Sequence, residues 1–197
     1  MSMIIDGVDF QNLPAEKFWS FPSGYKKNKQ DEIYAMIMSN AYIGSRKMDG
    51  AYYRFIKDMD GNMVLQGRSE SVNGGFLDKI DWVPHLHSFF DVLPRGTCLL
   101  GEIYFPNNEG SRHVTTIMGC LPEKARERQE KGEKLHYYVF DVWAWAGASL
   151  LSVTAETRFS QLGYISECVA RADNKFIEIA KYYYGQALWD ELMRVRM

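Results

Sequence analysis

Residues 47–70 read KMDGAYYRFIKDMDGNMVLQGRSE, and this stretch decides the fold that we expect around it. Ala51–Ile56 is rich in strand-forming residues, Asp60-Gly61 is typical of a hairpin turn, and Met63-Val64-Leu65 follows as a returning strand. A hairpin brings the two ends of the stretch to one edge of a sheet. Residues that are distant in sequence are therefore predicted to meet there.

Composition places the chain among soluble globular proteins. Its 197 residues suit one domain with a sizeable core, or one domain and a short appendage, and 46% are hydrophobic. The formal net charge of -2 gives no argument from charge alone for a nucleic-acid partner. Two short runs of basic residues remain candidates for a local basic face. They are Lys26, Lys27 and Lys29, and Lys124, Arg126 and Arg128. The second run is interspersed with glutamates, which favours a solvated helix face.

The three cysteines are few and far apart, so they predict neither a disulfide framework nor a metal site; they are Cys98, Cys120 and Cys168. This usage fits a reducing cytosol. The N-terminus lacks a basic segment followed by an apolar stretch, so we expect no signal peptide. The longest apolar runs are too short for a membrane span.

Strand patterns dominate the middle of the chain and helical patterns its end. Core strands are predicted at Cys98–Phe105 and Tyr137–Trp145, and an irregular arm at residues 1–28. Helices are predicted at Lys29–Ser39, in part of Phe76–Phe90, at Pro122–Gly132, at Thr154–Ala170 and at Lys175–Val195, with Thr154 and Asp173 as candidate N-caps. This order favours an α+β fold with largely antiparallel sheet.

Lys47 is the candidate nucleophile. A lysine amine attacks phosphorus only when uncharged, and nearby cations such as Arg46 favour that form. Asp49 could orient the amine or a metal. A lone Lys-x-Asp-Gly also fits a solvated loop lysine, but three ordered fragments strengthen the functional interpretation: Gln66-Gly67-Arg68-Ser69, Leu100-Gly101-Glu102-Ile103 and Tyr138-Val139-Phe140-Asp141.

These fragments supply the remaining parts of a nucleotide site. Arg68 can bind a phosphate through two donors, or be a surface arginine. Glu102 interrupts an apolar strand and needs a partner, either a ribose hydroxyl, a metal-bound water or a buried ion pair. Phe140 can stack on a purine or pack in the core. Asp141 can bind a metal or pair with a neighbouring cation.

Other common site patterns are missing from the sequence. His85-x-His87 is the only close histidine pair, and we expect it to be structural. Neither a G-x-x-x-x-G-K-[ST] phosphate loop nor a G-x-G-x-x-G fingerprint occurs. A bound ATP would therefore not occupy a P-loop or a Rossmann crevice.

The ordered motifs resemble those of the covalent nucleotidyltransferase superfamily, which comprises ATP-dependent DNA ligases, RNA ligases and mRNA capping enzymes. The wider sequence around these motifs resembles that of small phage-type DNA ligases. The resemblance implies that ATP is the cofactor, that AMP is carried covalently on Lys47, and that Mg²⁺ assists. It assigns catalysis to Lys47 and Asp49, nucleotide binding to Ser45, Arg46, Gly50, Arg54, Arg68, Glu102 and Phe140, and metal binding to Glu102 and Asp141.

Three departures from the family pattern matter. Leu100 replaces the aspartate of the Asp-Gly-Glu motif. Many members carry an arginine two residues after the glycine of Lys-x-Asp-Gly, where this chain has Tyr52, so Arg54 is the expected substitute on the same strand face. The family also continues into Glu-Gly and Lys-x-Lys motifs and an oligonucleotide-binding domain, whereas this chain stops at Arg196-Met197.

The resemblance implies that residues 29–197 are the N-terminal part of an adenylation domain with an ATP-grasp-like nucleotidyltransferase fold. The expected function is nick sealing by an ATP-dependent DNA ligase in a phage or bacterial host cytoplasm. Its partners are ATP and nicked double-stranded DNA, without a membrane, and the complete protein is expected to be a monomer. An RNA ligase and a catalytically incompetent nucleotide- or DNA-binding remnant remain alternatives. The 197-residue chain alone is expected to adenylate itself poorly or not at all.

Overall fold

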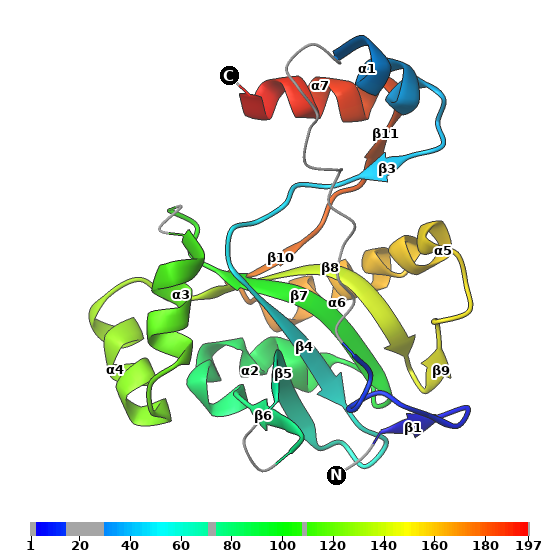
Figure 1. Ribbon diagram of the computed structural model, residues 1–197. Helices are drawn as coiled ribbons and strands as arrows, with labels where there is room; N and C mark the ends of the chain where they lie inside the picture. The colour runs from blue at the N-terminus through cyan, green and yellow to red at the C-terminus, as the bar shows by residue number, and fades with distance from the viewer. Residues whose placement is uncertain (1–2, 15–29, 71–73, 108–109, 197) are drawn as a thin grey trace. The chain divides into compact units, whose positions relative to one another are not determined.

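The structure is a computed structural model that describes residues 3–14, 30–70, 74–107 and 110–196 (Figure 1). Most of the expected arm, with the run Lys26, Lys27 and Lys29, lies outside these residues. The chain divides into two units. The first unit contains Met1–Pro14 and Met48–Ala180, and the second contains Ala15–Lys47 and Lys181–Met197.

A twisted sheet forms the centre of the first unit, and its order is β10-β8-β7-β4-β5-β6 with β9 beside β8 (Figure 1). The predicted hairpin is β4 (Ala51–Lys57) and β5 (Met63–Glu70), and the predicted core strands are β7 (Thr97–Tyr104) and β8 (His136–Trp145). The other strands are β6 (Phe76–Asp78), β9 (Ala148–Ser149) and β10 (Ile177–Ile179). Among the residues that the structure describes, neighbouring strands of this sheet pair antiparallel, except that β10 and β8 run parallel.

Aromatic packing covers one face of this sheet. The ring of Phe55 on β4 stacks on Phe90 of α2 (His87–Val92), with centroids 4.0 Å apart. Phe90 also meets Tyr137 of β8 edge-to-face, and α6 (Leu162–Ala172) packs beside α2. Because side chains alternate along a strand, Tyr52 and Arg54 project from the opposite face. That opposite face carries the polar residues singled out by the sequence.

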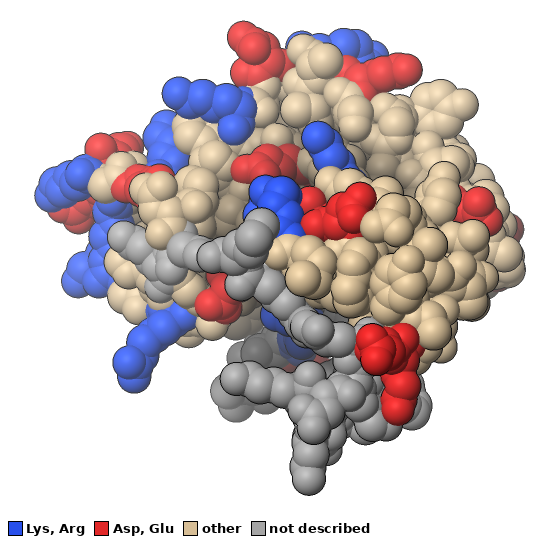
Figure 2. All heavy atoms as spheres, turned by 90° about the horizontal axis from the view of Figure 1, so that it is seen from above, with Lys and Arg blue, Asp and Glu red and all other residues tan. Residues whose placement is uncertain are grey.

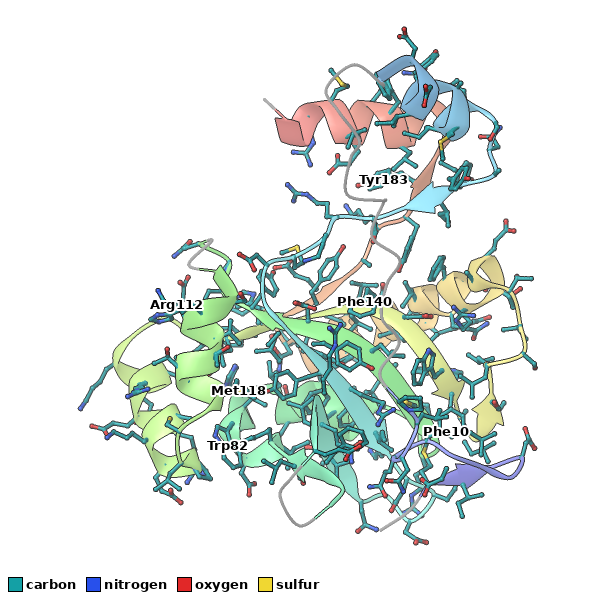
Figure 3. All side chains as sticks on the ribbon, in the orientation of Figure 1. Phe10, Trp82, Arg112, Met118, Phe140 and Tyr183 are labelled. Atoms are coloured by element: carbon teal, nitrogen blue, oxygen red, sulfur yellow. The ribbon has the colours of Figure 1, made fainter. Side chains whose placement is uncertain are left out.

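Shorter elements complete the first unit. The N-terminal hairpin, β1 (Ile4–Ile5) with β2 (Val8–Asp9), leads to Phe10, which is fully buried (Figure 3). The remaining elements are the 3₁₀ turns η1 (Ile80–Trp82) and η2 (Pro84–Leu86), and the helices α3 (Gly110–Met118), α4 (Pro122–Lys131) and α5 (Ala155–Ser160).

The second unit is small and pairs segments from both ends of the sequence. It contains α1 (Gln30–Met38), β3 (Ile43–Gly44), β11 (Tyr183–Tyr184) and α7 (Gly185–Arg196). Strands β3 and β11 pair antiparallel. Tyr34 of α1 meets Trp189 of α7 edge-to-face with ring centroids 5.0 Å apart. A Cβ atom on Gly44 would lie only 2.7 Å from Cδ1 of Leu188, so glycine lets β3 approach α7.

The α+β class with largely antiparallel sheet is confirmed, and so are most predicted elements. Helix α1 lies where Lys29–Ser39 was predicted to be helical, and α4 matches Pro122–Gly132. Thr154 caps α5, because its hydroxyl accepts a hydrogen bond from the backbone N–H of Thr157. In the described residues, no helix has both the length and the apolar character that crossing a membrane requires.

The single helix predicted at Lys175–Val195 is wrong. Ile177–Ile179 instead forms β10 beside β8, and helical structure begins only at Gly185. Asp173 is not an N-cap but ends α6 in a left-handed conformation with φ 48°. The amphipathic pattern was real, but β-branched residues beside the edge of an apolar strand gain more from pairing than from a helix.

Candidate functional site

Gly50 anchors the end of the Lys47–Gly50 motif against β7. A Cβ atom on Gly50 would lie 2.2 Å from the carbonyl oxygen of Ile103 and 2.9 Å from Cγ of Glu102. The nearest atom belongs to the backbone of a central strand, so a side chain cannot be accommodated by a rotamer change. Glycine is therefore required for the motif to pass this close to Glu102.

Gly101, which precedes Glu102 on β7, is needed for packing on the opposite face of the sheet. On the core face, a Cβ atom at Gly101 would lie 2.3 Å from Cε2 of Tyr137. The missing side chain makes room for that buried ring, while Glu102 projects from the other face.

A row of side chains crosses the open face of the sheet. Tyr52 on β4 is the cross-strand partner of Glu102 on β7, which is in turn opposite Tyr138 on β8. Directly opposed residues project from the same face. The Cζ atom of Arg68 on β5 lies 4.8 Å from the centroid of the Tyr52 ring. Arg68, Tyr52, Glu102 and Tyr138 thus form a continuous row.

Phe140 joins this row through a β-bulge. Leu100 pairs with Asp141 and Gly101 with Val139, which leaves Phe140 as the extra residue of β8. A bulge re-aims the side chain at the position it inserts. Phe140, which Figure 3 labels, is half-buried. Its ring centroid lies 6.3 Å from that of Tyr52. Its ring is therefore on the open face with Tyr52.

Asp49 lies beside the start of α3. Its Oδ1 accepts a hydrogen bond of 3.3 Å from the backbone N–H of Ser111. The first N–H groups of a helix lack partners within the helix, and the positive end of the helix dipole favours a carboxylate there. Asp49 is exposed, so the contact ties the motif to α3 without burying the carboxylate.

Lys47 ends the first of the two segments of the second unit, and its peptide bond to Met48 is one of the points where the chain passes from one unit to the other. Ser45, Arg46 and Lys47 are all exposed. Arg46 has its Nε 3.3 Å from Oε1 of Glu191 on α7. The structure therefore brings Gly50, Arg68, Glu102 and Phe140 together within one unit, while Ser45, Arg46 and Lys47 belong to the other.

The expectation that Arg54 contacts the nucleotide needs correction. Arg54 does share a strand face with Tyr52, but only 2% of it is exposed. Its guanidinium donates to the carbonyls of Leu13 and Gln11, at 2.9 and 2.8 Å, and to Oε1 of Gln66. The N-terminal segment thus accepts hydrogen bonds from both terminal nitrogens of Arg54, so this arginine links that segment to β4.

Asp141 is likewise better explained as an ion pair than as a metal ligand. Its two carboxylate oxygens accept hydrogen bonds from Arg158, at 2.9 and 3.1 Å. Among the described residues, no group of three or more His, Cys, Asp or Glu side chains is arranged to hold a metal. Glu102 is then the remaining candidate, and one carboxylate binds Mg²⁺ only together with substrate phosphates and water.

The two histidines of His85-x-His87 are structural, as predicted. Nε2 of His85 lies 2.8 Å from the carbonyl oxygen of Leu135, and Nε2 of His87 lies 3.2 Å from that of Ile80. Burial lowers the pKa of His85 to about 4. These rings therefore tie turns to neighbouring segments.

Sequence reasoning missed a polar cluster next to Gly50. The Tyr104 hydroxyl donates a hydrogen bond to Oε1 of Glu178, and Nδ1 of His136 lies 3.5 Å from the same oxygen. Burial lowers the pKa of His136, and Glu178 acts in the opposite direction. The Cβ of Tyr104 also lies 2.8 Å from the position of a Cβ on Gly50. The strand pairing of β10 creates this cluster, and no local pattern reveals it.

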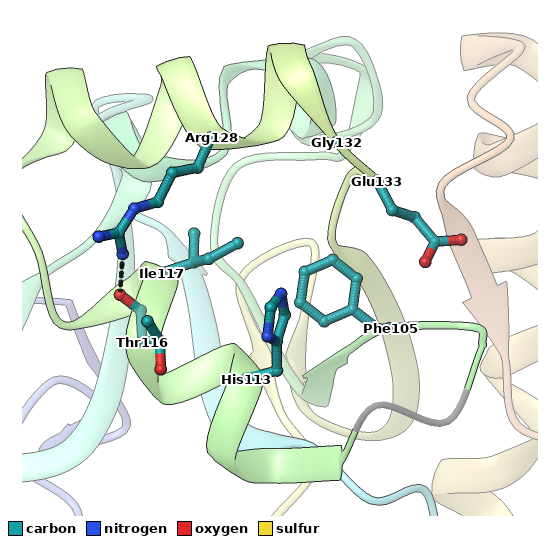
Figure 4. Close-up of a pocket in the computed structure, with 7 residues that line it drawn as sticks. All are labelled: Phe105, His113, Thr116, Ile117, Arg128, Gly132 and Glu133. Atoms are coloured by element: carbon teal, nitrogen blue, oxygen red, sulfur yellow. Dashed lines mark hydrogen bonds between the residues drawn. The ribbon is translucent and has the colours of Figure 1, made fainter.

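A pocket of about 340 Å³ lies away from the row, between α3 and α4 (Figure 4). It contains none of the predicted site residues. Phe105 and His113 pack edge-to-face within it, and Arg128 donates to the carbonyl oxygen of Thr116 at 2.8 Å. Arg128 thus links α4 to α3, and because the pocket contains none of the predicted site residues, the row on the sheet is the better candidate site.

The charges of α4 are mixed, as expected for a solvated helix face. Arg126 lies 3.7 Å from Glu123, and Lys131 is hydrogen-bonded to Glu127. Figure 2 shows basic and acidic side chains interspersed on the visible face. A continuous basic patch on α4 is therefore not supported.

The fold resembles that of DNA ligase adenylation domains. One solved structure that it matches comes from a structure-function analysis of Lig E DNA ligases, which bind DNA with a minimal scaffold. The sequence identity to that structure is 15% and the TM-score is 0.53. The match covers 81% of this chain and 52% of the other. Another is the ATP-dependent DNA ligase of bacteriophage T7 in complex with ATP, at 15% identity and a TM-score of 0.50. That match covers 84% of this chain and 55% of the other.

The likeness is one of fold. The chain spans about half the length of these two ligases. No protein-family model matches the chain, and a search of curated proteins found no match. The likeness of this chain to the two ligases is therefore seen in the fold and not in detectable sequence similarity.

Proposed function

We propose that this chain is the nucleotide-binding part of an ATP-dependent DNA ligase and that Lys47 accepts AMP from ATP. The observation that carries the proposal is the row on the open face, which includes Arg68, Glu102 and Phe140 and lies beside Gly50 in a ligase-like sheet. Two of the solved structures with a similar fold are DNA ligases, which favours DNA over RNA as the substrate.

The order of the strands matches the order of the parts of a nucleotide. Phe140 is on β8, Glu102 is on β7, and Arg68 is two strands further along, on β5. Adjacent strands lie about 4.8 Å apart. A nucleotide laid across them would stack its base on Phe140, donate a ribose hydroxyl to Glu102 and bring its phosphates to Arg68. Arg68 offers several donors in one plane, which suits phosphate.

The proposed chemistry begins at the amine of Lys47. Its nitrogen bonds to the α-phosphorus of ATP, the bond to the bridging oxygen breaks, pyrophosphate leaves and the amine loses a proton. The AMP then passes to a DNA 5′-phosphate, and a 3′-hydroxyl displaces AMP to join the strands. Bound Mg²⁺, held by Glu102 and the phosphates, would neutralise negative charge. Arg68 would bind the phosphates, and Gly50 would keep the motif seated beside Glu102.

The 197-residue chain should perform this chemistry poorly. Burial of Arg54 leaves Arg68 as the phosphate-binding cation of the row, while ATP carries concentrated negative charge. Loss of one preorganised electrostatic group typically lowers a rate by about 10²–10³. We therefore expect slow labelling, well below one AMP per chain, and no nick sealing.

Radiolabelled ATP and Mg²⁺, with nicked DNA or nicked RNA substrates, test the proposal. Slow labelling that Lys47→Ala abolishes would support it. Efficient sealing by residues 1–197 would contradict the account of the mechanism. A chain that binds ATP but never becomes labelled would instead be a catalytically incompetent remnant, and sealing of RNA alone would identify an RNA ligase.

A further inference from the structure

Tyr52 lies at the centre of the row and contacts the proposed phosphate-binding arginine. Its side chain is largely buried, whereas Arg68 is exposed. The Cζ atom of Arg68 lies over the Tyr52 ring at 4.8 Å from its centroid. We propose that Tyr52 is a positioning residue that holds the guanidinium of Arg68 ready for the phosphates of the nucleotide. This inference rests on the proposed function.

The surroundings of Tyr52 fix its ring. Tyr52 is on β4, an inner strand, with Glu102 as its neighbour on β7 and the Phe140 ring 6.3 Å away. A tyrosine has only two side-chain torsions, so a buried one offers a rigid surface. A free arginine side chain, by contrast, loses rotamer entropy when it binds a phosphate. Contact with the ring would remove part of that loss before the nucleotide arrives.

The type of contact also matters. A guanidinium that lies over an aromatic ring is attracted through its face, and its N–H donors, which lie in its plane, stay directed outward. The Cζ atom of Arg54 also lies over aromatic rings, at 5.5 Å from the Phe76 centroid and 5.8 Å from that of Trp143, but its terminal nitrogens donate to the carbonyl oxygens of Leu13 and Gln11. Burial and these hydrogen bonds, rather than the ring contact, therefore distinguish Arg54 from the exposed Arg68.

The ring of Tyr52 would act through the guanidinium of Arg68 instead of contacting the nucleotide itself. Tyr52 and Arg68 should therefore depend on each other energetically.

Calorimetric titration of the 197-residue chain with ATP and with adenosine tests this dependence. The variants are Tyr52→Leu, Tyr52→Phe, Arg68→Met and a double variant that combines Tyr52→Leu with Arg68→Met. Tyr52→Leu should weaken ATP binding by about two- to fivefold, the value of an exposed cation–π contact, and should leave adenosine binding unchanged. Tyr52→Phe should bind ATP like the unmodified chain, because it keeps the ring.

The double variant should bind ATP no more weakly than Arg68→Met alone. Tyr164→Leu is the matched control, because Tyr164 is 55% exposed on α6. Additive losses from Tyr52→Leu and Arg68→Met, or an equal loss of adenosine binding, would overturn the positioning role. An unmodified chain that binds no ATP would overturn the proposed function and this inference with it.

A second measurement needs no folded Tyr52→Leu variant. In the unmodified chain, the Arg68 side-chain protons should show upfield ring-current shifts in NMR spectra, and Tyr52→Phe should retain them. Random-coil positions for these protons would overturn the inference even if ATP binds.

Discussion

Gly50→Ala tests the way in which the Lys47–Gly50 motif is seated on the sheet. The added Cβ would lie 2.2 Å from the carbonyl oxygen of Ile103, about 0.8 Å inside the 3.0 Å that real Cβ atoms almost never go below. Its next neighbours are Cβ of Tyr104 and Cγ of Glu102, at 2.8 and 2.9 Å. Either β7 or the loop must move.

The expected cost follows from two opposing terms. Inserting a methyl group into a well-packed site costs about 1–3 kcal/mol, and contact with a central strand places this site near the upper end. Loss of unfolded-state entropy on replacing glycine by alanine returns at most about 1 kcal/mol. We therefore expect Gly50→Ala to lower the free energy of unfolding by about 2 kcal/mol. It should also weaken ATP binding, because displacement of Glu102 disturbs the row.

Gly163→Ala is the control for this substitution. Gly163 is in α6, and a Cβ atom there would point into open space. Alanine there should stabilise the helix by up to about 1 kcal/mol and leave ATP binding unchanged. Urea unfolding followed by tryptophan fluorescence measures both variants. A Gly50→Ala protein within about 0.5 kcal/mol of the unmodified chain, which is the usual range for harmless surface changes, would refute the packing argument.

Three further predictions concern single side chains. Glu102→Ala should weaken ATP binding by about 1–3 kcal/mol, the value of a hydrogen bond to a charged group, and an unchanged affinity in calorimetry would favour a purely structural role. Arg54→Met should lower the free energy of unfolding by about 2–4 kcal/mol, because buried carbonyls lose charged donors; reduced ATP affinity with unchanged stability would restore Arg54 to the site. Burial lowers the folded-state pKa of His85 from 6.5 to about 4. Between these two pH values, His85 is therefore protonated in the unfolded chain but not in the folded chain. Stability should therefore fall as pH drops from 6.5 to 4, with His85 contributing at most about 3 kcal/mol, and His85→Gln should flatten that part of the urea-unfolding curve against pH.

Much of the fold could be predicted from local patterns. The hairpin of β4 and β5 follows from strand-forming residues around Asp60-Gly61, and β7 and β8 follow from apolar runs. These elements carry Arg68 and Glu102, so their meeting on one face was also predictable. Lys175–Val195 shows the limit, because the edge of β8 is available only in the folded chain.

The roles of individual residues were harder to predict than their positions. Arg54 is on the predicted face, but its partners Leu13 and Gln11 are more than 40 residues away in sequence. Asp141 is paired by Arg158, which α5 brings back to β8. The bulge that presents Phe140 depends on the register of β7 against β8, which the sequence of one strand does not reveal.

Peptide mapping after long incubation with ATP and Mg²⁺ tests the central claim most directly. The account predicts a minor population of chains with one added AMP, all of it on the peptide that contains Lys47. Lys47→Ala should carry none, and neither should Lys47→Arg, since a guanidinium stays protonated and is a poor nucleophile. AMP on any other residue, or an adduct that persists in Lys47→Ala, would contradict the account.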